Sequence, residues 1–430
     1  MIRVIDSPSI VSIPSQAFGS SICIIGYSTK GPILEPIFTR SISDASSKFG
    51  EGKLIQAFEE ATRSGGKEVY LIRIDENEDK FSQLESAYSI IEDLPIHIVV
   101  PVVAYMDEEI NFALQLATHC HMAKSRIGVI GVKPIDNPEE ILSYVSNLIT
   151  NQRMRDGFYL ESEDISHLIS VVASEVIIEN SLGHRYTTNG AASYAGLLSS
   201  LPEGSSPSNK ILSGVKSLRY SFPSHVIESI SLNKENNLVS FKDLIRNPLR
   251  PIDIKGFVPN NERTFYFIEN KDYVVDFQNE VILWINEDES SGATSIVYSI
   301  DEEEALSNAG YVVFRSSTHG VFPRLGVTAS NQKKLRDVGS VRDILYIIDT
   351  IKLLSEDLIG ETRVQSVQNI DSRLRFFLNG LIRKQIIKTF SLRVYHEGHD
   401  VVINLDLILF SSIESVTVAI DLGKQEESYE

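Results

Sequence analysis

Residues 96–132 read IHIVVPVVAYMDEEINFALQLATHCHMAKSRIGVIGV and carry the clearest fold signal of the chain. The apolar run over 96–103 predicts a buried strand, the stretch over 108–122 predicts a helix, and 126–132 predicts a second strand. The same alternation extends on both sides, where we predict strands over 21–26 and 68–74 and helices over 54–63, 82–92 and 138–151, the last capped by Asn137. Strands and helices that alternate in this way predict an α/β layer with a largely parallel sheet.

The rest of the chain predicts a mixed α/β (α+β) protein with several domains. Residues 168–179 form one more apolar run, which predicts a strand, and 190–198 read as a small-residue helix that permits close backbone packing. We divide the chain into an extended arm at 1–17, an α/β domain at 18–220, an inserted β-rich outer module at 221–300, and an inner α+β domain at 301–430 whose end forms a strand.

Charge and composition exclude several classes of protein. The formal net charge of −18 argues against a general affinity for nucleic acid. No apolar run approaches the roughly 20 residues of a membrane helix. The first residues of the sequence lack the basic segment followed by an apolar segment that is typical of a signal peptide. Cys23 and Cys120 both lie in apolar segments, which indicates a reducing compartment rather than a disulfide framework.

The carboxyl end combines a basic helix with alternating strands. We predict a helix over 370–390, followed by strands over 401–410 and 415–422, with His396 and His399 in a hairpin loop between the helix and the first strand. Between 362 and 395, seven basic residues minus one acidic residue leave +6; the basic ones are Arg363, Arg373, Arg375, Arg383, Lys384, Lys388 and Arg393. They form either a solvated helix face or a docking face for an acidic partner.

Both termini have the character of strands that need a partner. In 415–422 the apolar positions alternate with small or polar ones, which is typical of a half-buried strand; they are Val416, Val418, Ile420 and Leu422. The amino-terminal arm is broken by Pro8 and Pro14, and its apolar residues include Ile2, Val4, Ile10 and Ile13.

Motifs for catalysis or cofactor binding are weak. The loop over 26–32 has glycines at both ends but Pro32 and Ile33 where a phosphate-binding loop needs lysine and a hydroxyl. His119 and His121 stand two apart in a predicted helix and so point to different faces, which disfavours a metal site. We therefore expect no enzyme, no cofactor and no metal. The alternative of another class is an α/β nucleotide-binding enzyme that uses the Gly26–Gly31 loop.

Two stretches together resemble contractile phage tail sheath proteins. The first is Ile24–Pro32 with Pro36, Phe49-Gly50, Ala57 and the Gly65-Gly66 pair that leads to Arg73; the second is Asn189–Leu198 with Ser206–Lys210 and Gly214-Val215. The order of segments from Leu306–Gly310 to the terminal strand is also similar. Residues 221–299 read as an insertion relative to simpler sheath proteins, and Val321–Gly326 matches the family pattern poorly.

The resemblance implies a mechanical role. Such a subunit would form stacked rings around a tail tube and contract to drive the tube through the host cell envelope for genome delivery. The arm residues named in the two terminal segments would exchange strands between subunits, and Arg373, Arg375, Arg383 and Lys384 would face the tube or a neighbour. The implied partners are further copies of the chain, the tail tube protein, and the baseplate and tail terminator proteins, without nucleic acid or direct membrane insertion.

The implied location is the virion, after assembly in the host cytoplasm. An alternative within the same family is the sheath of a phage-derived contractile injection system, such as an R-type bacteriocin, an extracellular injection system or a type VI secretion apparatus.

Overall fold

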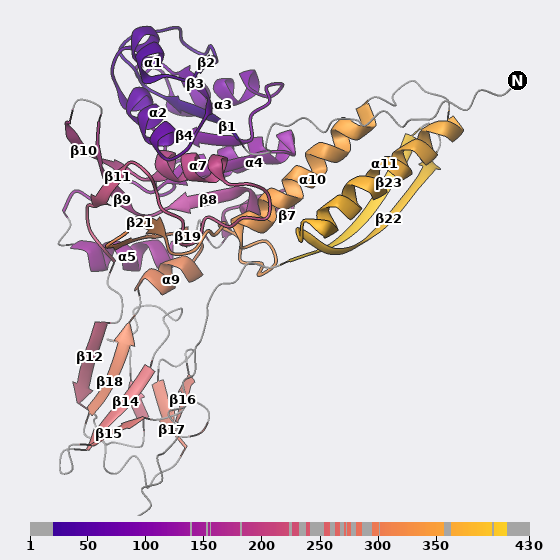
Figure 1. Ribbon diagram of the computed structural model, residues 1–430. Coiled ribbons are helices and arrows are strands. Elements are labelled where there is room, and N and C mark those ends of the chain that lie inside the picture. Colours follow the sequence, from indigo (N-terminus) through magenta and orange to yellow (C-terminus); the bar gives the residue numbers. More distant parts are fainter. Residues whose placement is uncertain are drawn as a thin grey trace, which may run out of the picture.

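The computed structural model describes residues 20–137, 140–151, 154, 156–180, 183–222, 226–231, 238–240, 253–258, 263–266, 271, 273–276, 281–285, 295–300, 302–356, 363–397 and 400–410. Within these residues the chain is a mixed α/β protein, as predicted (Figure 1). No described helix is long and apolar enough to cross a membrane.

A seven-stranded sheet forms the centre of the α/β body, in the order β19-β8-β5-β4-β1-β3-β2. Its strands are β1 (Ser21–Gly26), β2 (Ile37–Thr39), β3 (Glu68–Arg73), β4 (Ile98–Pro101), β5 (Ile127–Gly131), β8 (Ile169–Val172) and β19 (Tyr311–Val312). Only the pairing of β2 with β3 is antiparallel in this sheet, which confirms the predicted parallel layer. Because β1, β4, β5 and β8 are buried along their whole length, they read as continuous apolar runs in the sequence.

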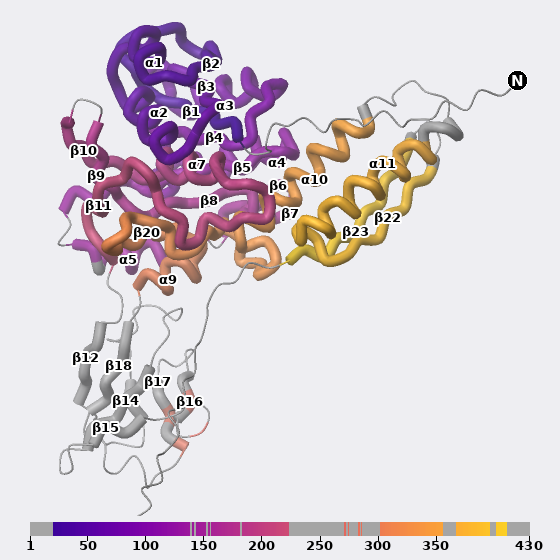
Figure 2. Tube along the Cα trace, in the orientation of Figure 1, coloured from indigo at the N-terminus to yellow at the C-terminus, as the bar shows by residue number. Residues whose placement is uncertain are grey.

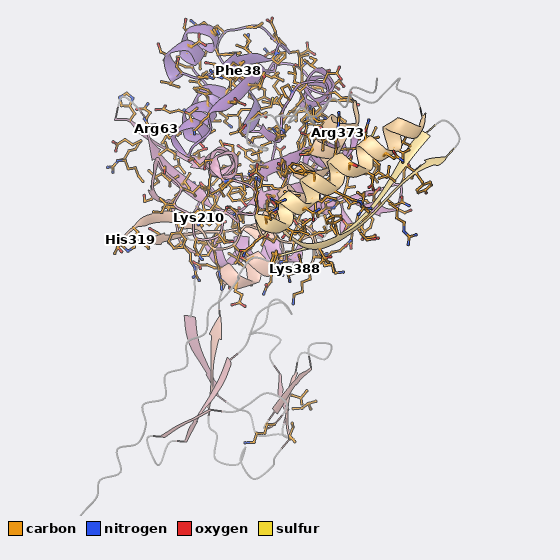
Figure 3. The ribbon with its side chains drawn as sticks, turned by 45° about the vertical axis from the view of Figure 1, so that its right-hand side comes forward. Phe38, Arg63, Lys210, His319, Arg373 and Lys388 are labelled. Carbon is orange, nitrogen blue, oxygen red and sulfur yellow. The ribbon has the colours of Figure 1, made fainter. Side chains whose placement is uncertain are left out.

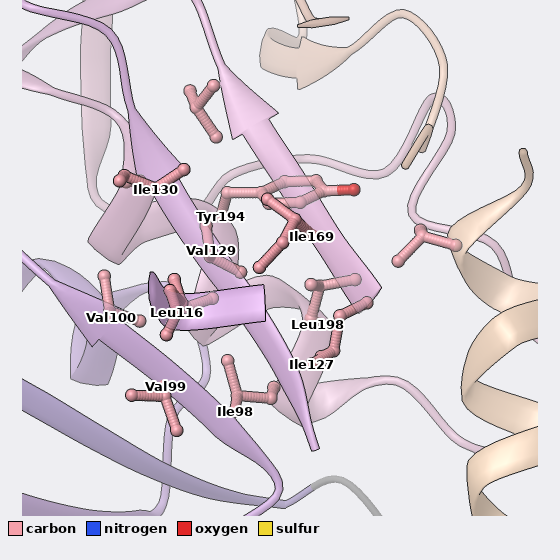
Figure 4. Packing of buried hydrophobic residues seen from close by; sticks show 14 of the residues in the cluster. Ile98, Val99, Val100, Leu116, Ile127, Val129, Ile130, Ile169, Tyr194 and Leu198 are labelled. Atoms are coloured by element: carbon pink, nitrogen blue, oxygen red, sulfur yellow. The ribbon is translucent and has the colours of Figure 1, made fainter. Parts of the chain in front are cut away.

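Helices cover this sheet and supply the rest of its core. They are α1 (Ile42–Phe49), α2 (Lys53–Arg63), α3 (Lys80–Ile90), α4 (Phe112–Ala123), α5 (Ile141–Thr150), α7 (Ala191–Ser200) and α9 (Glu302–Asn308), with a short 3-10 turn η2 (Ser166–Leu168). Figure 4 shows Leu116 of α4 and Tyr194 and Leu198 of α7 among the valines and isoleucines of the strands. The small residues of α7 allow the predicted close approach, since a Cβ on Gly196 would lie 2.2 Å from the Ala61 carbonyl oxygen of α2.

Two predicted helices begin later than expected. The helix predicted from residue 108 begins at Phe112, because the Asn111 side chain caps it by accepting a hydrogen bond from the Leu114 amide at 3.0 Å. The helix predicted over 138–151 is α5, whose N-cap position is Glu140, so the prediction of Asn137 as N-cap is wrong.

The apolar run over 168–179 is not one strand. It contains β8, in the main sheet, and β9 (Glu175–Glu179), which belongs to a three-stranded sheet with β10 (Arg185–Asn189) and β11 (Val215–Leu218). Ser174 separates the two strands: its carbonyl accepts from the Gly190 amide and its hydroxyl accepts from the Phe314 amide. Two further hairpins complete the body, β6 (Tyr159–Leu160) with β7 (Glu163–Asp164) and β20 (Phe314–Ser317) with β21 (Gly320–Pro323).

Apart from Lys271 and Ile285, the described residues of 226–300 lie in strands. One antiparallel sheet has the order β12-β18-β14-β15 and a second has β13-β17-β16. Their bounds are β12 (Val226–Ser231), β13 (Leu238–Ser240), β14 (Asp253–Val258), β15 (Arg263–Tyr266), β16 (Tyr273–Asp276), β17 (Val281–Trp284) and β18 (Ser295–Ile300). The predicted domain boundaries stay a prediction, and β19, beyond residue 300, pairs with β8 of the main sheet.

The carboxyl part consists of two long helices and a hairpin. Figure 2 traces the chain from α10 (Val338–Glu356) through α11 (Arg363–Arg383) into β22 (Ile387–Glu397) and β23 (Asp400–Leu409). The helix predicted over 370–390 is therefore wrong at its end, because the chain leaves the helix at Arg383 and enters a strand. Gln385 makes this change of direction with a φ of 58°. The predicted strand over 401–410 is confirmed as β23. His396, predicted in a hairpin loop, lies in β22 opposite Val401, and His399 lies outside the described residues.

Candidate assembly interface

Helix α11 packs along one face of the β22–β23 hairpin (Figure 1). Its buried residues recur with helical spacing and form one stripe: Ile370, Leu374, Phe377, Leu378 and Leu381. The hairpin meets this stripe with alternate residues of each strand, which are Phe390, Leu392 and Val394 of β22 and Val401, Ile403, Leu405, Leu407 and Leu409 of β23. The alternation follows from the period of two in a strand, so one face of the hairpin is apolar and packed.

The two strands form a sheet of their own with two open edges. The structure gives β22 and β23 no other strand partner among the described residues. Glu397 lies opposite Asp400 with two residues between them, and such a short connection closes through a hydrogen-bonded pair. Hydrogen-bonded and non-hydrogen-bonded pairs alternate, so Leu392 with Leu405, five positions beyond the closing pair, is non-hydrogen-bonded. The main-chain groups of such pairs point outward, to the open edges of the sheet.

Both outer faces of this unit, on α11 and on the hairpin, expose apolar side chains. Phe376 of α11 is 73% exposed, and Ile408 at the end of β23 is 56% exposed. Tyr395 and Phe410 are also exposed, and the Lys388 ammonium lies 5.3 Å from the centre of the Phe410 ring. Exposed aromatic and aliphatic groups beside open strand edges are features of a surface that another chain covers.

The four predicted contact residues do not share one face of α11. At 3.6 residues per turn, one sector of roughly 100° around the helix axis contains Arg373, Arg383 and Lys384 together with Phe376. Arg383 and Lys384 are exposed at the carboxyl end of the helix, where cations also complement the helix dipole, and Arg373 (Figure 3) is half-buried. We call Arg373, Phe376, Arg383 and Lys384 the basic sector. Its contact with a tube or neighbour stays a prediction.

Arg375 lies on the other flank of α11 and faces the hairpin. Its Nε donates to the Asp371 carboxylate at 2.8 Å, and its Nη2 donates to the Leu392 carbonyl oxygen of β22 at 3.1 Å. The side chain is about half exposed, so the ion pair alone adds little stability. Sequence reasoning grouped Arg375 with the other cations because it did not place a strand beside the helix.

The predicted strand-exchange residues lie outside the described part of the chain. This applies to the amino-terminal positions Ile2, Val4, Ile10 and Ile13 and to the carboxyl-terminal positions Val416, Val418, Ile420 and Leu422. Their role in assembly stays a prediction.

The Gly26–Gly31 loop uses its backbone donors within the protein. The Thr29 amide donates to the Glu51 carbonyl at 2.8 Å, and the Lys30 amide donates to the Phe49 carbonyl at 3.1 Å. A phosphate-binding loop instead points consecutive amides at the ligand. These two hydrogen bonds therefore disfavour the nucleotide-binding alternative.

A cavity of about 270 Å³ lies beside the carboxyl ends of β4 and β5, between α2 and the start of α7. Glu60 of α2 is 2% exposed at its wall, and burial raises the pKa of its carboxyl well above the usual range. Asn189, also in the wall, donates to the Val132 and Val172 carbonyls and is fixed by the backbone. The lining residues contain no cysteine, histidine or serine that could act as a nucleophile with a base, and the described residues contain no cluster of metal ligands.

Comparisons with known proteins find similarity at the level of structure. No family model matches the chain, and no curated protein matches its sequence. The helical sheath of the anti-feeding prophage in its contracted state aligns with a TM-score of 0.59 and 12% identity over 98% of both chains. A chain of the baseplate of the same particle aligns with a TM-score of 0.60 and 10% identity, over 98% of this chain and 100% of the other.

A crystal structure gives the same result. The sheath tail protein of Desulfitobacterium hafniense aligns with a TM-score of 0.53 and 8% identity, over 95% of this chain and all of that one. These alignments span the α/β body, the inserted strands and the carboxyl-terminal hairpin together. The resemblance seen in the sequence is thus confirmed in three dimensions: the chain has the fold of tail sheath proteins.

Proposed function

We propose that this chain is a structural subunit of a contractile tail sheath. The observation that carries the proposal is the likeness to a helical sheath subunit over 98% of both chains, from the α/β body to the terminal hairpin. A shared domain in an unrelated protein would align over a part of the chain only. The role is mechanical rather than catalytic.

Subunits link to one another by strand addition. An extended segment binds the open edge of a sheet through main-chain hydrogen bonds, and alternate side chains give specificity. The β22–β23 hairpin has such edges, and the terminal segments of a neighbouring copy supply the strands. Head-to-tail contacts of this kind do not close on themselves and so generate a helical assembly.

The assembled sheath surrounds a tail tube and shortens to drive it through a cell envelope. In this arrangement the basic sector of α11 faces the tube or an adjacent subunit, where its charge opposes the overall −18 of the chain. The tail tube, baseplate and terminator proteins are the further partners, the finished particle is a virion, and assembly takes place in the host cytoplasm.

A second candidate is the sheath of a phage-derived contractile injection system. Two of the three similar structures described above come from the anti-feeding prophage, which supports keeping this candidate beside the phage tail. The two candidates share the subunit fold and the strand-linked assembly, and differ in what the particle carries.

Electron microscopy of the purified full chain tests the proposal. We expect helical tubes in negative stain, and we expect them to vanish on deletion of residues 1–14 or 415–430 while the melting temperature stays near that of the full chain. A full chain that remains a small oligomer across salt and concentration would contradict the sheath role. Tubes formed equally well by both truncated chains would contradict strand addition alone.

A further inference from the structure

The cavity at the carboxyl ends of β4 and β5 lies where parallel sheets bind ligands. Strand β1 stands between β3 and β4 in the main sheet, so the chain extends the sheet first to one side of β1 and then to the other. In open α/β sheets, ligands bind outside the carboxyl ends of the strands at such a reversal. The wall here is formed by α2, which follows β1, by residues that follow β4 and β5, and by the segment that leads into α7. The volume of about 270 Å³ is just below the usual range of ligand pockets, roughly 300–1,000 Å³, and so suits a small molecule.

Glu60 lies in this wall with a carboxyl oxygen that is not satisfied. The residue is 2% exposed, and its Oε2 atom has no hydrogen-bond partner among the described residues. Burial raises the pKa of its carboxyl well above the usual range, the Thr188 hydroxyl donates a hydrogen bond that lowers it, and the charge of Glu59 raises it. The charged neighbour that acts on Glu60 is therefore another acid. A buried acceptor without a donor lowers stability, and a ligand that brings a donor recovers this loss.

An organic ammonium group supplies what Glu60 lacks. It brings N–H donors and a positive charge together, and hydrogen bonds between two ionised groups are the strong ones. A metal ion would need several ligands around it, and the described residues contain no cluster of acidic, histidine or cysteine side chains. The wall around Glu60 is otherwise largely apolar and can pack against the carbon chain of a ligand; it includes Ala57, Pro101, Val102, Ala104 and Ala192.

Lys53 lies at the other end of the same wall. It precedes Glu60 by seven residues in α2, so the two residues share one face of the helix and lie two turns apart, roughly 10 Å along its axis. Lys53 is exposed, and its ammonium lies 6.0 Å from the centre of the Tyr105 ring, which also lines the cavity. The cavity thus has an acid at its buried end and a base at its exposed end.

We propose that this cavity binds a small zwitterion of the ω-amino acid type, with its ammonium paired to Glu60 and its carboxylate facing Lys53. The Glu60 carboxyl is ionised in the complex and releases its proton to solvent when the ligand binds. The site belongs to the α/β body alone and is separate from the α11 surface proposed for assembly. Glu60 is then a binding residue that lowers the stability of the empty protein.

Equilibrium dialysis of the full chain against labelled δ-aminovalerate tests the site. We expect saturable binding of one molecule per chain. Valerate lacks the ammonium and should not compete. Pentylamine lacks the carboxylate and should bind about threefold more weakly, because a charge pair with an exposed lysine adds little. Lys53→Ala should remove this difference between δ-aminovalerate and pentylamine.

The pH dependence separates ligand binding by Glu60 from a structural role. Below the folded pKa the carboxyl must lose its proton to bind an ammonium, so the affinity should rise by up to tenfold per pH unit from about pH 5 and level off above that pKa. Glu60→Gln should weaken binding at least tenfold and abolish the pH dependence. Glu51→Gln removes the same charge from an exposed position outside the wall and should change neither.

Four results would overturn the proposal in whole or in part. No binding of millimolar δ-aminovalerate by the folded full chain would overturn the site. Unchanged binding by a Glu60→Gln variant with a cooperative thermal melt would overturn Glu60 as the partner. Affinity that falls as pH rises, or valerate that competes as well as δ-aminovalerate, would overturn the ammonium as the recognised group. Equal affinities of δ-aminovalerate and pentylamine would overturn the role of Lys53. Should Glu60→Gln fail to fold, the pH profile and the competition by valerate in the unmodified chain still decide the proposal.

Discussion

Glu60 shows how one buried acid ties stability to pH. It lies in the wall of the cavity beside α2, and burial raises its pKa from an unfolded value near 4.5. The Glu60 carboxyl therefore stays protonated up to a higher pH in the folded chain than in the unfolded chain. The contribution of the protonated Glu60 carboxyl to the stability of the folded chain is complete below about pH 4.5. It is lost as pH rises through the folded pKa.

We expect Glu60→Gln to raise the melting temperature at pH 8 by a few degrees and to change it little at pH 4, because glutamine needs no proton. Thermal melts across this pH range measure the difference. Glu59→Gln is the matched control one residue earlier; it removes the ion pair of Glu59 with Arg63 and should not raise stability at pH 8. A Glu60→Gln variant that is less stable at every pH would contradict this account.

At the scale of elements, the sequence predicted the strands that are buried on both faces, but of the two hairpin strands that are buried on one face it predicted β23 and missed β22. Strands β1, β4 and β5 were predicted because a short, uninterrupted apolar run is typical of a strand covered on both faces. Strand β22 was missed although Phe390, Leu392 and Val394 alternate, because the basic residues before it favoured continuation of the helix. Helix α1 was also missed, although Ser41 accepts a capping bond from the Asp44 amide.

The candidate site was predicted less well than the fold. Pairing between strands is a long-range property, so the position of β22 beside Arg375 could not be found from spacing along the chain. The sequence also groups Arg375 with Arg373, which stands two residues away and therefore points to another side of the helix. Alternation in the terminal segments was visible, but a strand edge that could receive them appears only once β22 and β23 are paired.

Two glycines in helices should respond to alanine in opposite directions. In α7, a Cβ on Gly196 would lie 2.2 Å from the Ala61 carbonyl, so Gly196→Ala must separate α7 from α2 and should cost about 1–3 kcal/mol. In α11, a Cβ on Gly380 would meet nothing within 4 Å, so Gly380→Ala should stabilise by about 0.5–1 kcal/mol. Urea denaturation of both variants measures the changes, and equal signs would contradict the packing described for α7.

At the scale of the whole molecule, charge is distributed unevenly. The chain carries −18 overall, whereas residues 362–395 carry seven basic residues against one acidic residue. An assembly of subunits with like net charge repels itself unless contacts bring opposite charges together. The basic sector of α11 is suited to such a contact, with the exposed Phe376 ring among its cations.

We therefore expect Arg383→Glu with Lys384→Glu to weaken formation of the extended sheath on its tube. The loss should be largest at low salt and should shrink as salt rises, because exposed charges are screened over about 8–10 Å at physiological ionic strength. Lys333→Glu with Lys334→Glu is the matched control, since both lysines are exposed on the α/β body and lie outside the basic sector. Sedimentation of sheath–tube complexes across a salt series measures the effect. Equal losses for both double variants would show that net charge alone causes the effect. No loss for the α11 variant would show that Arg383 and Lys384 face solvent and make no assembly contact.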